Sequence, residues 1–336
     1  MASDPEFAAA LAELQSAAAA STPNPVSSSS PQEAIREKMR QSTKIMQQVL
    51  AKTLPPESAY SVEDRLVPVE GGQIKVRIVI PTTDDEAKTF PVHVWIHGGG
   101  FVFGDLDNDD YQLRKISVDQ QIVTVNVDYR LAPEHPFPVG LTDSLTALKW
   151  TVENAASIRV DTSKGLIVGG DSAGGNLATS IGHLVRDDPF FEGRPVTGLL
   201  LREPSVINPA AYPDELKADL LAYDEYQNTP TLTRAGLLQT RAWLNAPPAD
   251  PRYSPVLAPS HAGLAPAFIQ YNEQDPLRDD ARVLEKLIRE AGGKVKSVFY
   301  PGVPHAFYYL APSISLAQKV WRDTEEGLRW LLAGAP

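Results

Sequence analysis

Short, almost wholly apolar runs that alternate with helical patterns are the feature that most constrains how this chain folds. The runs lie at residues 92–96, 122–127, 166–168, 199–201, 267–271 and 295–300, and apolar residues at helical spacing separate several of them, at 141–150, 177–185 and 282–288. A strand that is apolar on both faces needs cover on both faces, which predicts a mostly parallel sheet flanked by helices. Alternating apolar and polar residues at 74–80 predict a half-exposed antiparallel strand upstream.

Two regions lie outside this alternation. Residues 1–50 contain a stretch of Ala, Ser and Pro at 17–31, which predicts a flexible linker. A helix is expected from Ser30 onward; we expect it to pack on its own domain with Arg36 and the other basic residues facing solvent, rather than to lie on a membrane. In the second region, residues 205–260, a long insertion rich in Pro, Tyr and Leu predicts a lid, with a helix near 235–244.

Charge and composition exclude several classes of protein. The formal net charge of −11 argues against nucleic acid as a partner, because phosphates need a basic surface. The chain has no cysteine, which excludes disulfides and thiolate chemistry. No Lys or Arg precedes Arg36 and no apolar stretch reaches membrane-spanning length. We therefore expect a cytoplasmic enzyme without a signal peptide or a transmembrane segment.

A serine between glycines follows one of the buried strands. Gly170-Asp171-Ser172-Ala173-Gly174 comes directly after the strand at 166–168 and opens a helix expected at 173–186. Flanking glycines permit a strained strand-to-helix turn that exposes the serine hydroxyl. The helix N-terminus also favours negative charge that develops during a reaction. Ser172 is therefore the candidate nucleophile.

A glycine run follows the strand at 92–96. Residues 97–100 read His-Gly-Gly-Gly. Successive glycines let backbone N–H groups approach a ligand with no side chain between them. A tetrahedral intermediate needs such a pair of donors, and the alternative is a plain glycine turn.

A base and an acid also lie at strand ends. His305 follows the strand at 295–300, and Asp275 follows the strand at 267–271. The order Ser172, Asp275, His305 is that of α/β-hydrolases. Asp279 and Asp280 are rivals for the acid, but an N-cap role at the start of the next helix accounts for them. We assign Asp275 to hold the imidazole of His305.

These motifs together resemble the hormone-sensitive-lipase-like, or family IV, esterases of the α/β-hydrolase fold. The matching segments are 97–101, 128–134, 170–176, 275–279 and 305–307, spread in order over about three quarters of the chain. The resemblance implies a sheet of about eight strands, an oxyanion hole made by the N–H groups of Gly99, Gly100 and Ala173, and a cap formed by 1–50 and 205–260 over a catalytic domain at 51–336. It also implies that the shared polar residues of 128–134 have structural roles, namely Asp128, Arg130 and Glu134.

The chain departs from the family pattern at two strand ends. Residues 271–274 read Tyr-Asn-Glu-Gln where a glycine is usual, which leaves the shape of the acid loop open. Arg202 and Glu203 place charges where relatives tend to be apolar or aromatic. These two charges either alter the floor of the acyl pocket or pair with each other.

Other candidate sites are set aside or left open. His93 and His97 are four residues apart on a strand, hence about 13 Å apart, so they cannot share a metal ion, and no metal site is expected. No phosphate-binding glycine motif occurs in the chain. Tyr223, Tyr226 and Trp243 of the insertion could line the substrate pocket, or equally form the core of the cap.

The resulting hypothesis is a serine carboxylesterase that cleaves short- to medium-chain acyl esters through an acyl-enzyme on Ser172, without a cofactor. The acyl-chain range follows from the family resemblance alone. A lactonase, a deacetylase or a tailoring hydrolase would use the same residues. A non-catalytic receptor of this fold is the alternative from another class, and the presence of His305 argues against it. The resemblance also implies that two copies can pair through the strand near 295–300.

Overall fold

A computed structural model describes residues 3–20 and 30–336 of the 336-residue chain. Most of the linker predicted at 17–31 therefore lies outside the described residues. Ten α-helices occur in the described part of the chain: α1 (Pro5–Ala20), α2 (Pro31–Leu50), α3 (Asp110–Gln120), α4 (Val139–Glu153), α5 (Ala173–Arg186), α6 (Ala222–Glu225), α7 (Arg234–Leu244), α8 (Arg278–Glu290), α9 (Phe307–Leu310) and α10 (Ser315–Leu332). Among these residues, no helix combines the length and the apolar character needed to cross a membrane.

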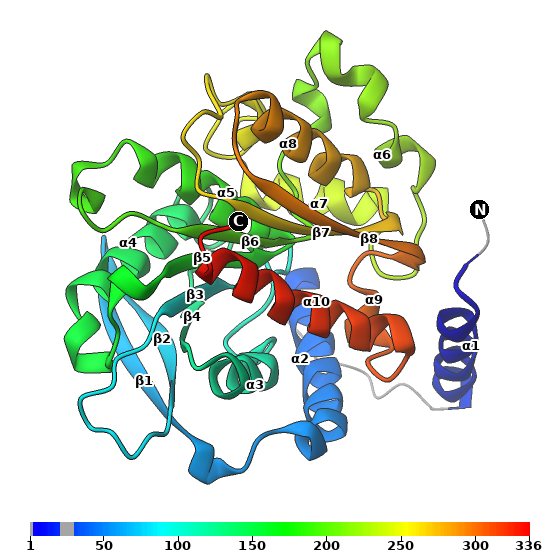
Figure 1. Cartoon of the computed structure of the whole chain (residues 1–336). Helices are drawn as coiled ribbons and strands as arrows, with labels where there is room; N and C mark the ends of the chain where they lie inside the picture. The colour runs from blue at the N-terminus through cyan, green and yellow to red at the C-terminus, as the bar shows by residue number, and fades with distance from the viewer. Residues whose placement is uncertain (1–2, 21–29) are drawn as a thin grey trace.

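One sheet forms the centre of the protein, as the apolar runs predicted (Figure 1). Its strands pair in the order β1-β2-β4-β3-β5-β6-β7-β8. β1 and β2 pair antiparallel, β2 and β4 pair antiparallel, and every later neighbour is parallel. The bounds are β1 (Tyr60–Val69), β2 (Gly72–Pro81), β3 (Val92–Ile96), β4 (Val123–Asp128), β5 (Leu166–Asp171), β6 (Gly198–Arg202), β7 (Ala267–Gln274) and β8 (Val295–Pro304).

Helices cover both faces of this sheet (Figure 1). α4, α5 and α8 pack on one face, and α3 and α10 pack on the other. Neighbouring residues of a strand point to opposite faces, so each strand contributes to two cores. Leu199 and Leu201 of β6 belong to the core under α5 and α8, whereas Leu200 packs with the residues of α3 and α10. The even-numbered residues of β6 therefore face α10.

The strand β1 was not predicted from the sequence. It pairs with β2 along its whole length, from Tyr60 opposite Pro81 to Val69 opposite Gly72. Most of its residues are exposed or half-buried, and Val62 and Leu66 are exposed. An edge strand with so little burial lacks the apolar pattern by which the other strands were found. β8 forms the opposite edge, and pairing of two copies through it stays a prediction.

The N-terminal helices both contact the part of the molecule that bears the site. In α1, Phe7 is buried and packs edge-to-face on Phe307, with ring centroids 6.3 Å apart. In α2, Arg36 donates to the carbonyls of Val102 and Ala132, at 3.0 and 2.9 Å. The prediction that α2 packs on its own domain is confirmed, but the prediction that Arg36 faces solvent is wrong. The reason is that its guanidinium fork can donate to two loop carbonyls at once, and these carbonyls lie far from it in the chain.

Candidate active site

Ser172 occupies a sharp turn between β5 and α5. Its φ of +52° and ψ of −111° lie outside the usual regions for a residue with a side chain. Two glycines make the turn possible, because a Cβ on Gly170 would lie 2.3 Å from the carbonyl oxygen of Gly174, and a Cβ on Gly174 would lie 2.0 Å from that of Ile96. The close approach of α5 to the strands leaves Ser172 partly exposed at the carboxyl edge of the sheet.

The structure brings the three predicted residues into one hydrogen-bonded line. The hydroxyl Oγ of Ser172 lies 3.0 Å from Nε2 of His305, and Nδ1 of His305 lies 2.8 Å from Oδ2 of Asp275. Asp275 is fully buried and His305 nearly so, while the serine faces the open side. If Nδ1 carries the proton, Asp275 accepts a hydrogen bond from this N–H group. Nε2 is then free to accept a hydrogen bond from the serine hydroxyl.

The rival acids have different partners. Asp279 accepts hydrogen bonds from the backbone N–H groups of Leu221 and Ala222, at 2.9 and 2.7 Å. Asp280 accepts from those of Val206 and Ile207, at 2.9 and 3.2 Å. The predicted N-cap role is wrong, because α8 begins earlier, at Arg278, with Leu277 as its N-cap. Both carboxylates instead anchor the insertion to the domain.

The glycine run lies beside the serine. A Cβ on Gly98 would be 3.4 Å from that of Ser172, and Gly99 and Gly100 have positive φ angles of 118° and 60°. Both are partly exposed. Within the described residues, the backbone N–H groups of Gly99, Gly100 and Ala173 donate to no protein acceptor. Three N–H groups next to a candidate nucleophile are what an oxyanion requires.

A fourth side chain, Glu203, reaches His305, and the sequence analysis missed its role. Oε2 of Glu203 lies 3.1 Å from Nδ1 of His305, and the Glu203 side chain is 1% exposed. The same oxygen accepts from the N–H of Ala306 at 2.7 Å, and Oε1 accepts from the amide of Asn272. The signal was present as a charged residue at a strand end where relatives tend to be apolar.

The adjacent Arg202 does not pair with Glu203, so that predicted alternative is wrong. Its Nη2 donates to Asp109 at 3.0 Å, and its Nε lies 3.3 Å from Asp171. Four aromatic rings surround the guanidinium at 4.8–5.8 Å: Trp95, Tyr308, Tyr309 and Trp321. Strand alternation is the reason, because Arg202 points to the α10 face whereas Glu203 lies beyond the strand end.

The acid loop at 271–274 also joins this network. Asn272 donates to Glu203 and, at 2.8 Å, to the carbonyl of Pro304. Glu273 accepts from the N–H of Gly302 at 2.6 Å. Both departures from the family pattern therefore meet behind His305, where they connect the ends of β6, β7 and β8.

Burial and charge act on His305 in opposite directions. Burial by itself lowers its pKa, but the negative charges of Asp275 and Glu203 outweigh that effect and raise the pKa to about 10. Burial raises the pKa of the Glu203 carboxyl, while the neighbouring His305 opposes that rise. The site therefore holds its proton on the imidazole more strongly than an ordinary histidine does.

Two groups of residues bear on the expectation that the chain has no metal site. β3 is a strand, as predicted, with His93 within it and His97 directly after it. Glu203, Asp275 and His305 each offer one atom within 4.8 Å of the others, which is close enough for a shared ion. However, Leu277 N–H donates to Asp275 at 2.8 Å, and Glu203 already accepts two donors. Such carboxylates suit a shared imidazole N–H without an ion.

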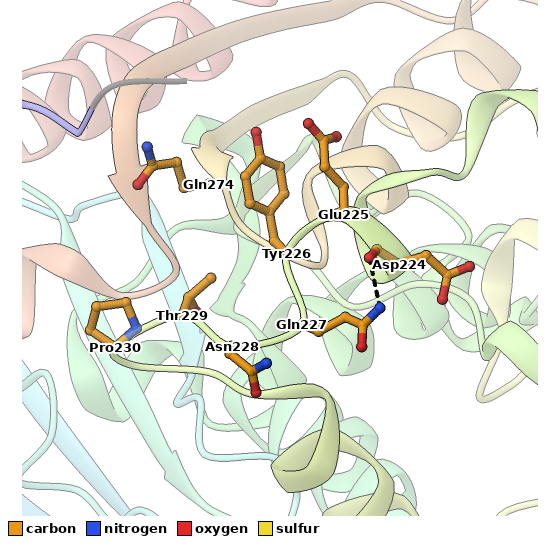
Figure 2. Close-up of a pocket in the computed structure, with 8 residues that line it drawn as sticks. All are labelled: Asp224, Glu225, Tyr226, Gln227, Asn228, Thr229, Pro230 and Gln274. Carbon is orange, nitrogen blue, oxygen red and sulfur yellow. Dashed lines mark hydrogen bonds between the residues drawn. The ribbon is translucent and has the colours of Figure 1, made fainter.

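The predicted aromatic residues of the insertion take different positions. Tyr223 is buried against Leu237 and Leu277, as expected if it forms part of the cap core. Trp243 is half-buried and packs edge-to-face on Phe103, with centroids 6.3 Å apart. Tyr226 stands beside a surface pocket of about 460 Å³ that is formed by 224–230 and Gln274 (Figure 2). A substrate role for any of the three stays a prediction.

The insertion touches the candidate site in two places. Thr231 donates through its hydroxyl to the carbonyl oxygen of His305. Thr240 of α7 lies so close to Gly100 that a Cβ there would be 3.0 Å from its methyl group. Thr231 and Thr240 of the insertion therefore lie beside the loop of His305 and the glycine run, and the cap role of residues 205–260 stays a prediction.

The polar residues of 128–134 contact the backbone and other side chains. Arg130 forms an ion pair with the buried Asp143 at 2.7 Å and donates to the carbonyl of Glu70. Glu134 forms a two-pronged pair with Arg36, at 2.7 and 2.9 Å. Burial raises the pKa of Asp128 at the end of β4. The contacts of Arg130 and Glu134 support the structural role that was predicted for them, and the role of Asp128 stays a prediction.

Comparisons with known proteins show the family of the chain. A family described as alpha/beta hydrolase fold matches residues 93–309. The carboxylesterase NlhH of Mycobacterium tuberculosis is 37% identical over 266 residues, which cover 76% of this chain and 79% of that protein. The versiconal hemiacetal acetate esterase of Dothistroma septosporum is 32% identical over 266 residues, covering 79% of this chain and 80% of that one.

A solved structure resembles the whole chain. The crystal structure of vibralactone cyclase superposes with a TM-score of 0.92 and 39% sequence identity, and the match covers 100% of this chain and 96% of that chain. The likeness extends over both predicted cap regions as well as over the sheet.

Proposed function

The chain belongs to the hormone-sensitive-lipase-like branch of the α/β-hydrolases and is a carboxylic ester hydrolase, and on that premise we propose that it is a serine carboxylesterase with Ser172 as nucleophile. The line of contacts from Ser172 through His305 to Asp275, at 3.0 and 2.8 Å, is the observation that carries this proposal. Hydroxyl, imidazole and carboxylate in this order form the template of nucleophilic acyl transfer.

The first half of the reaction forms an acyl-enzyme. His305 takes the proton of the Ser172 hydroxyl through Nε2 while the serine oxygen attacks the ester carbonyl carbon. The carbonyl oxygen becomes an oxyanion and accepts from the N–H groups of Gly99, Gly100 and Ala173. His305 then gives its proton to the departing alcohol, and the acyl group stays on the serine.

The second half returns the enzyme to its starting state. His305 takes a proton from a water molecule, and the resulting hydroxide attacks the acyl carbon. The oxyanion forms again and collapses, the serine oxygen leaves with the proton from His305, and the carboxylic acid is released. In this sequence His305 takes a proton from Ser172 and later from water, and gives it to the departing alcohol and then to the serine oxygen.

The insertion and the N-terminal helices supply the cap in this proposal. Support comes from Thr240 over Gly100, from Thr231 on the carbonyl of His305, and from Arg36 of α2 on the loop that follows the glycine run. A cap over the site gives the pocket a finite length, which favours esters with short or medium acyl chains.

Lactone chemistry is a second candidate for the same residues. The similarity to vibralactone cyclase, at 39% identity over the whole chain, is the observation that favours it. If a hydroxyl of the acyl chain replaced water in the second half, the acyl-enzyme would release a lactone instead of an acid. A panel of nitrophenyl esters, lactones and hydroxyacyl esters distinguishes the two by the product that accumulates.

Ser172→Ala is the test of the proposed function. We expect a loss of about 10⁶-fold in kcat, because serine, base and acid act as one unit. The measurement is the burst of p-nitrophenol from p-nitrophenyl butyrate, together with labelling of the wild type by one equivalent of an organophosphonate. Ser313→Ala, at an exposed site, is the control and should change neither readout. A variant within tenfold of the wild type would remove Ser172 from the mechanism.

A further inference from the structure

Glu203 is a buried acid that the esterase mechanism above does not use. It follows directly after β6, has a positive φ of 47°, and is 1% exposed. Ser172 and Ala306 also have positive φ angles, of 52° and 54°, and Glu203 contacts the N–H of Ala306. Residues with side chains keep such unfavourable backbone conformations only where the surrounding structure holds them in place, and this is common at functional sites. Three such residues meet around His305.

The contacts of Glu203 fit the ionised form of its carboxyl group. Oε2 faces the N–H of Ala306 at 2.7 Å and Nδ1 of His305 at 3.1 Å, and Oε1 faces the amide of Asn272. All three groups are hydrogen-bond donors when His305 carries a proton on Nδ1. A protonated Glu203 would have to donate, and none of these three contacts would accept from it.

Nδ1 of His305 therefore faces two carboxylates at once. Asp275 lies at 2.8 Å and Glu203 at 3.1 Å, and the two acids come from different strand ends, after β7 and after β6. Asp275 has the shorter contact and is itself fixed by the N–H of Leu277. The N–H group of Ala306 holds Glu203 in place. Because Ala306 is the residue after His305, Glu203 is tied to the loop that carries the histidine.

We propose that Glu203 is a second positioning residue for His305, which shares the Nδ1–H group with Asp275 and strengthens the imidazole as a base. This inference rests on the proposed function, in which His305 is the base. A carboxylate that accepts the same N–H holds the same tautomer, with Nε2 left free toward Ser172. Its charge also stabilises the imidazolium that forms when the serine loses its proton.

The charges around His305 determine the direction of the pH effect. Asp275 faces it from the end of β7, Glu203 from the end of β6 and Asp171 from β5, and all three raise its pKa against the lowering effect of burial. Arg202 offsets Asp171 through an ion pair, whereas no cation among the described residues pairs with Glu203 or Asp275 other than His305 itself. The excess of negative charge therefore moves the titration of His305 to a higher pH than that of an ordinary histidine.

Glu203→Gln removes this second charge and keeps the size of the side chain. We expect the acid limb of the kcat/KM profile to move to lower pH by about one unit or more, because an opposite charge at this distance shifts a pKa by about 1–3 units. The plateau at alkaline pH should fall, because a weaker base takes the serine proton less readily. A purely structural role would lower the plateau and leave the midpoint of the limb in place.

Glu273→Gln is the matched control. Glu273 lies next to Asn272 and accepts from the backbone of β8 through Gly302, but no contact joins it to His305 among the described residues. The same loss of charge at this position should leave the acid limb unchanged. The amide introduced by E203Q would also face the amide of Asn272, donor to donor. Should E203Q fail to fold, the pair Glu203→Gln with Asn272→Ser removes that conflict and carries the same charge change.

Asp275→Asn tests whether Glu203 acts on the tautomer. In a serine protease with one acid, the equivalent change costs about 10⁴ in kcat because the imidazole takes the wrong tautomer. Here Glu203 still accepts from Nδ1–H, so we expect a loss of only about 10², with the larger loss appearing in the double variant D275N/E203Q. Equal losses in D275N and in the double variant would overturn the proposal.

A readout without catalysis separates this inference from the proposed function. The chain has six histidines, so ¹⁵N-histidine labelling of the Ser172→Ala variant gives a simple spectrum in which His305 can be followed against pH. The Nε2 signal should report loss of the second imidazole proton at a higher pH than for an ordinary histidine, with Nδ1–H kept throughout, and E203Q should lower the midpoint of that titration. An inactive wild type would refute the esterase proposal alone. A midpoint unchanged by E203Q would refute the role of Glu203 alone.

Discussion

Two buried charges that are neighbours in the chain have opposite surroundings. Arg202 and Glu203 are each 1% exposed, and both lie at the carboxyl end of β6. Arg202 points to the face covered by α10, whereas Glu203 lies in the network behind His305. Their environments differ in how charge is balanced, and that difference separates a charge that stabilises the fold from one that faces the candidate base.

The Arg202 cluster is closed. The guanidinium contacts the carboxylates of Asp109 and Asp171, and four aromatic rings cover it. The carboxylates are satisfied in turn: Asp109 accepts from Trp95 at 2.9 Å, and Asp171 accepts from Tyr308 at 2.9 Å. Two carboxylates therefore balance the buried positive charge, although Nε of Arg202 makes no hydrogen bond, and a buried charge that is balanced in this way contributes order.

The Glu203 cluster is open. Two acids share one imidazole, so negative charge is in excess, and the far side of that imidazole reaches the partly exposed Ser172. Excess charge next to a titratable group shifts its pKa, and a partly exposed neighbour lets the proton leave. The comparison indicates that an unbalanced charge, rather than burial itself, distinguishes Glu203, for which we propose a positioning role, from Arg202.

Arg202→Met should have the largest effect on stability. It leaves Asp109 and Asp171 buried without their cation, and breaking a buried pair in this way costs about 3–5 kcal/mol. Urea unfolding measures the change. Lys217→Met is the control, because Lys217 and Asp214 form a solvent-exposed pair, and its loss should leave the unfolding free energy nearly unchanged. A loss below about 1 kcal/mol for R202M would mean that Asp109 and Asp171 do not depend on Arg202 for charge balance.

Asp171→Asn tests the border between the two clusters. Asp171 contacts Arg202 and two tyrosines, yet it also acts on the charge of His305. We expect a loss of about 1–3 kcal/mol in unfolding free energy from the unmatched buried donors. The acid limb of kcat/KM should move to lower pH by less than in E203Q, because Arg202 already offsets the Asp171 charge. A shift of the acid limb as large as that in E203Q would mean that Arg202 does not offset the effect of Asp171 on His305.

Tyr309→Phe should have the smallest effect. The hydroxyl accepts from Arg202 at 3.0 Å and donates to Asp109 and Asp171, so its removal should cost about 1–2 kcal/mol in unfolding free energy. The pH profile of kcat/KM should not change, because the hydroxyl lies on the closed side. Tyr226→Phe, at the surface pocket, is the control and should alter stability less. A changed pH profile in Y309F would mean that the surroundings of Arg202 also influence the pKa of His305.

Much of the architecture could be predicted from local patterns. The apolar runs identified β3 to β8, because strands that are buried on both faces leave a continuous signal, and the alternation at 74–80 identified β2. The turn at Ser172 was predicted because its glycines are required by close backbone contacts. β1 was missed because it is an edge strand with few buried residues. The direction of Arg36 and the partners of Asp279 and Asp280 were also missed, since each depends on carbonyls or N–H groups far away in the chain.

The residues of the candidate site also fall into those that the sequence predicted and one whose role it did not. Ser172, Asp275 and His305 were singled out from motifs and chain order, and the structure places them within hydrogen-bonding distance. Glu203 was noticed only as a misplaced charge. Its chemistry depends on which residues surround it, and three of them come from the ends of other strands: Asn272, Asp275 and Ala306.

By itself the sequence determined most of the segments that become strands, the exception being β1, and which residue types sit at the strand ends, because those follow from periodicity and from backbone sterics within a few residues. Only the tertiary structure decided which of two adjacent charges would be neutralised and which would be left in excess beside the imidazole. The physical reason is that electrostatic energy depends on distances through space and on burial, and both are established only when the ends of separate strands meet at one edge of the sheet.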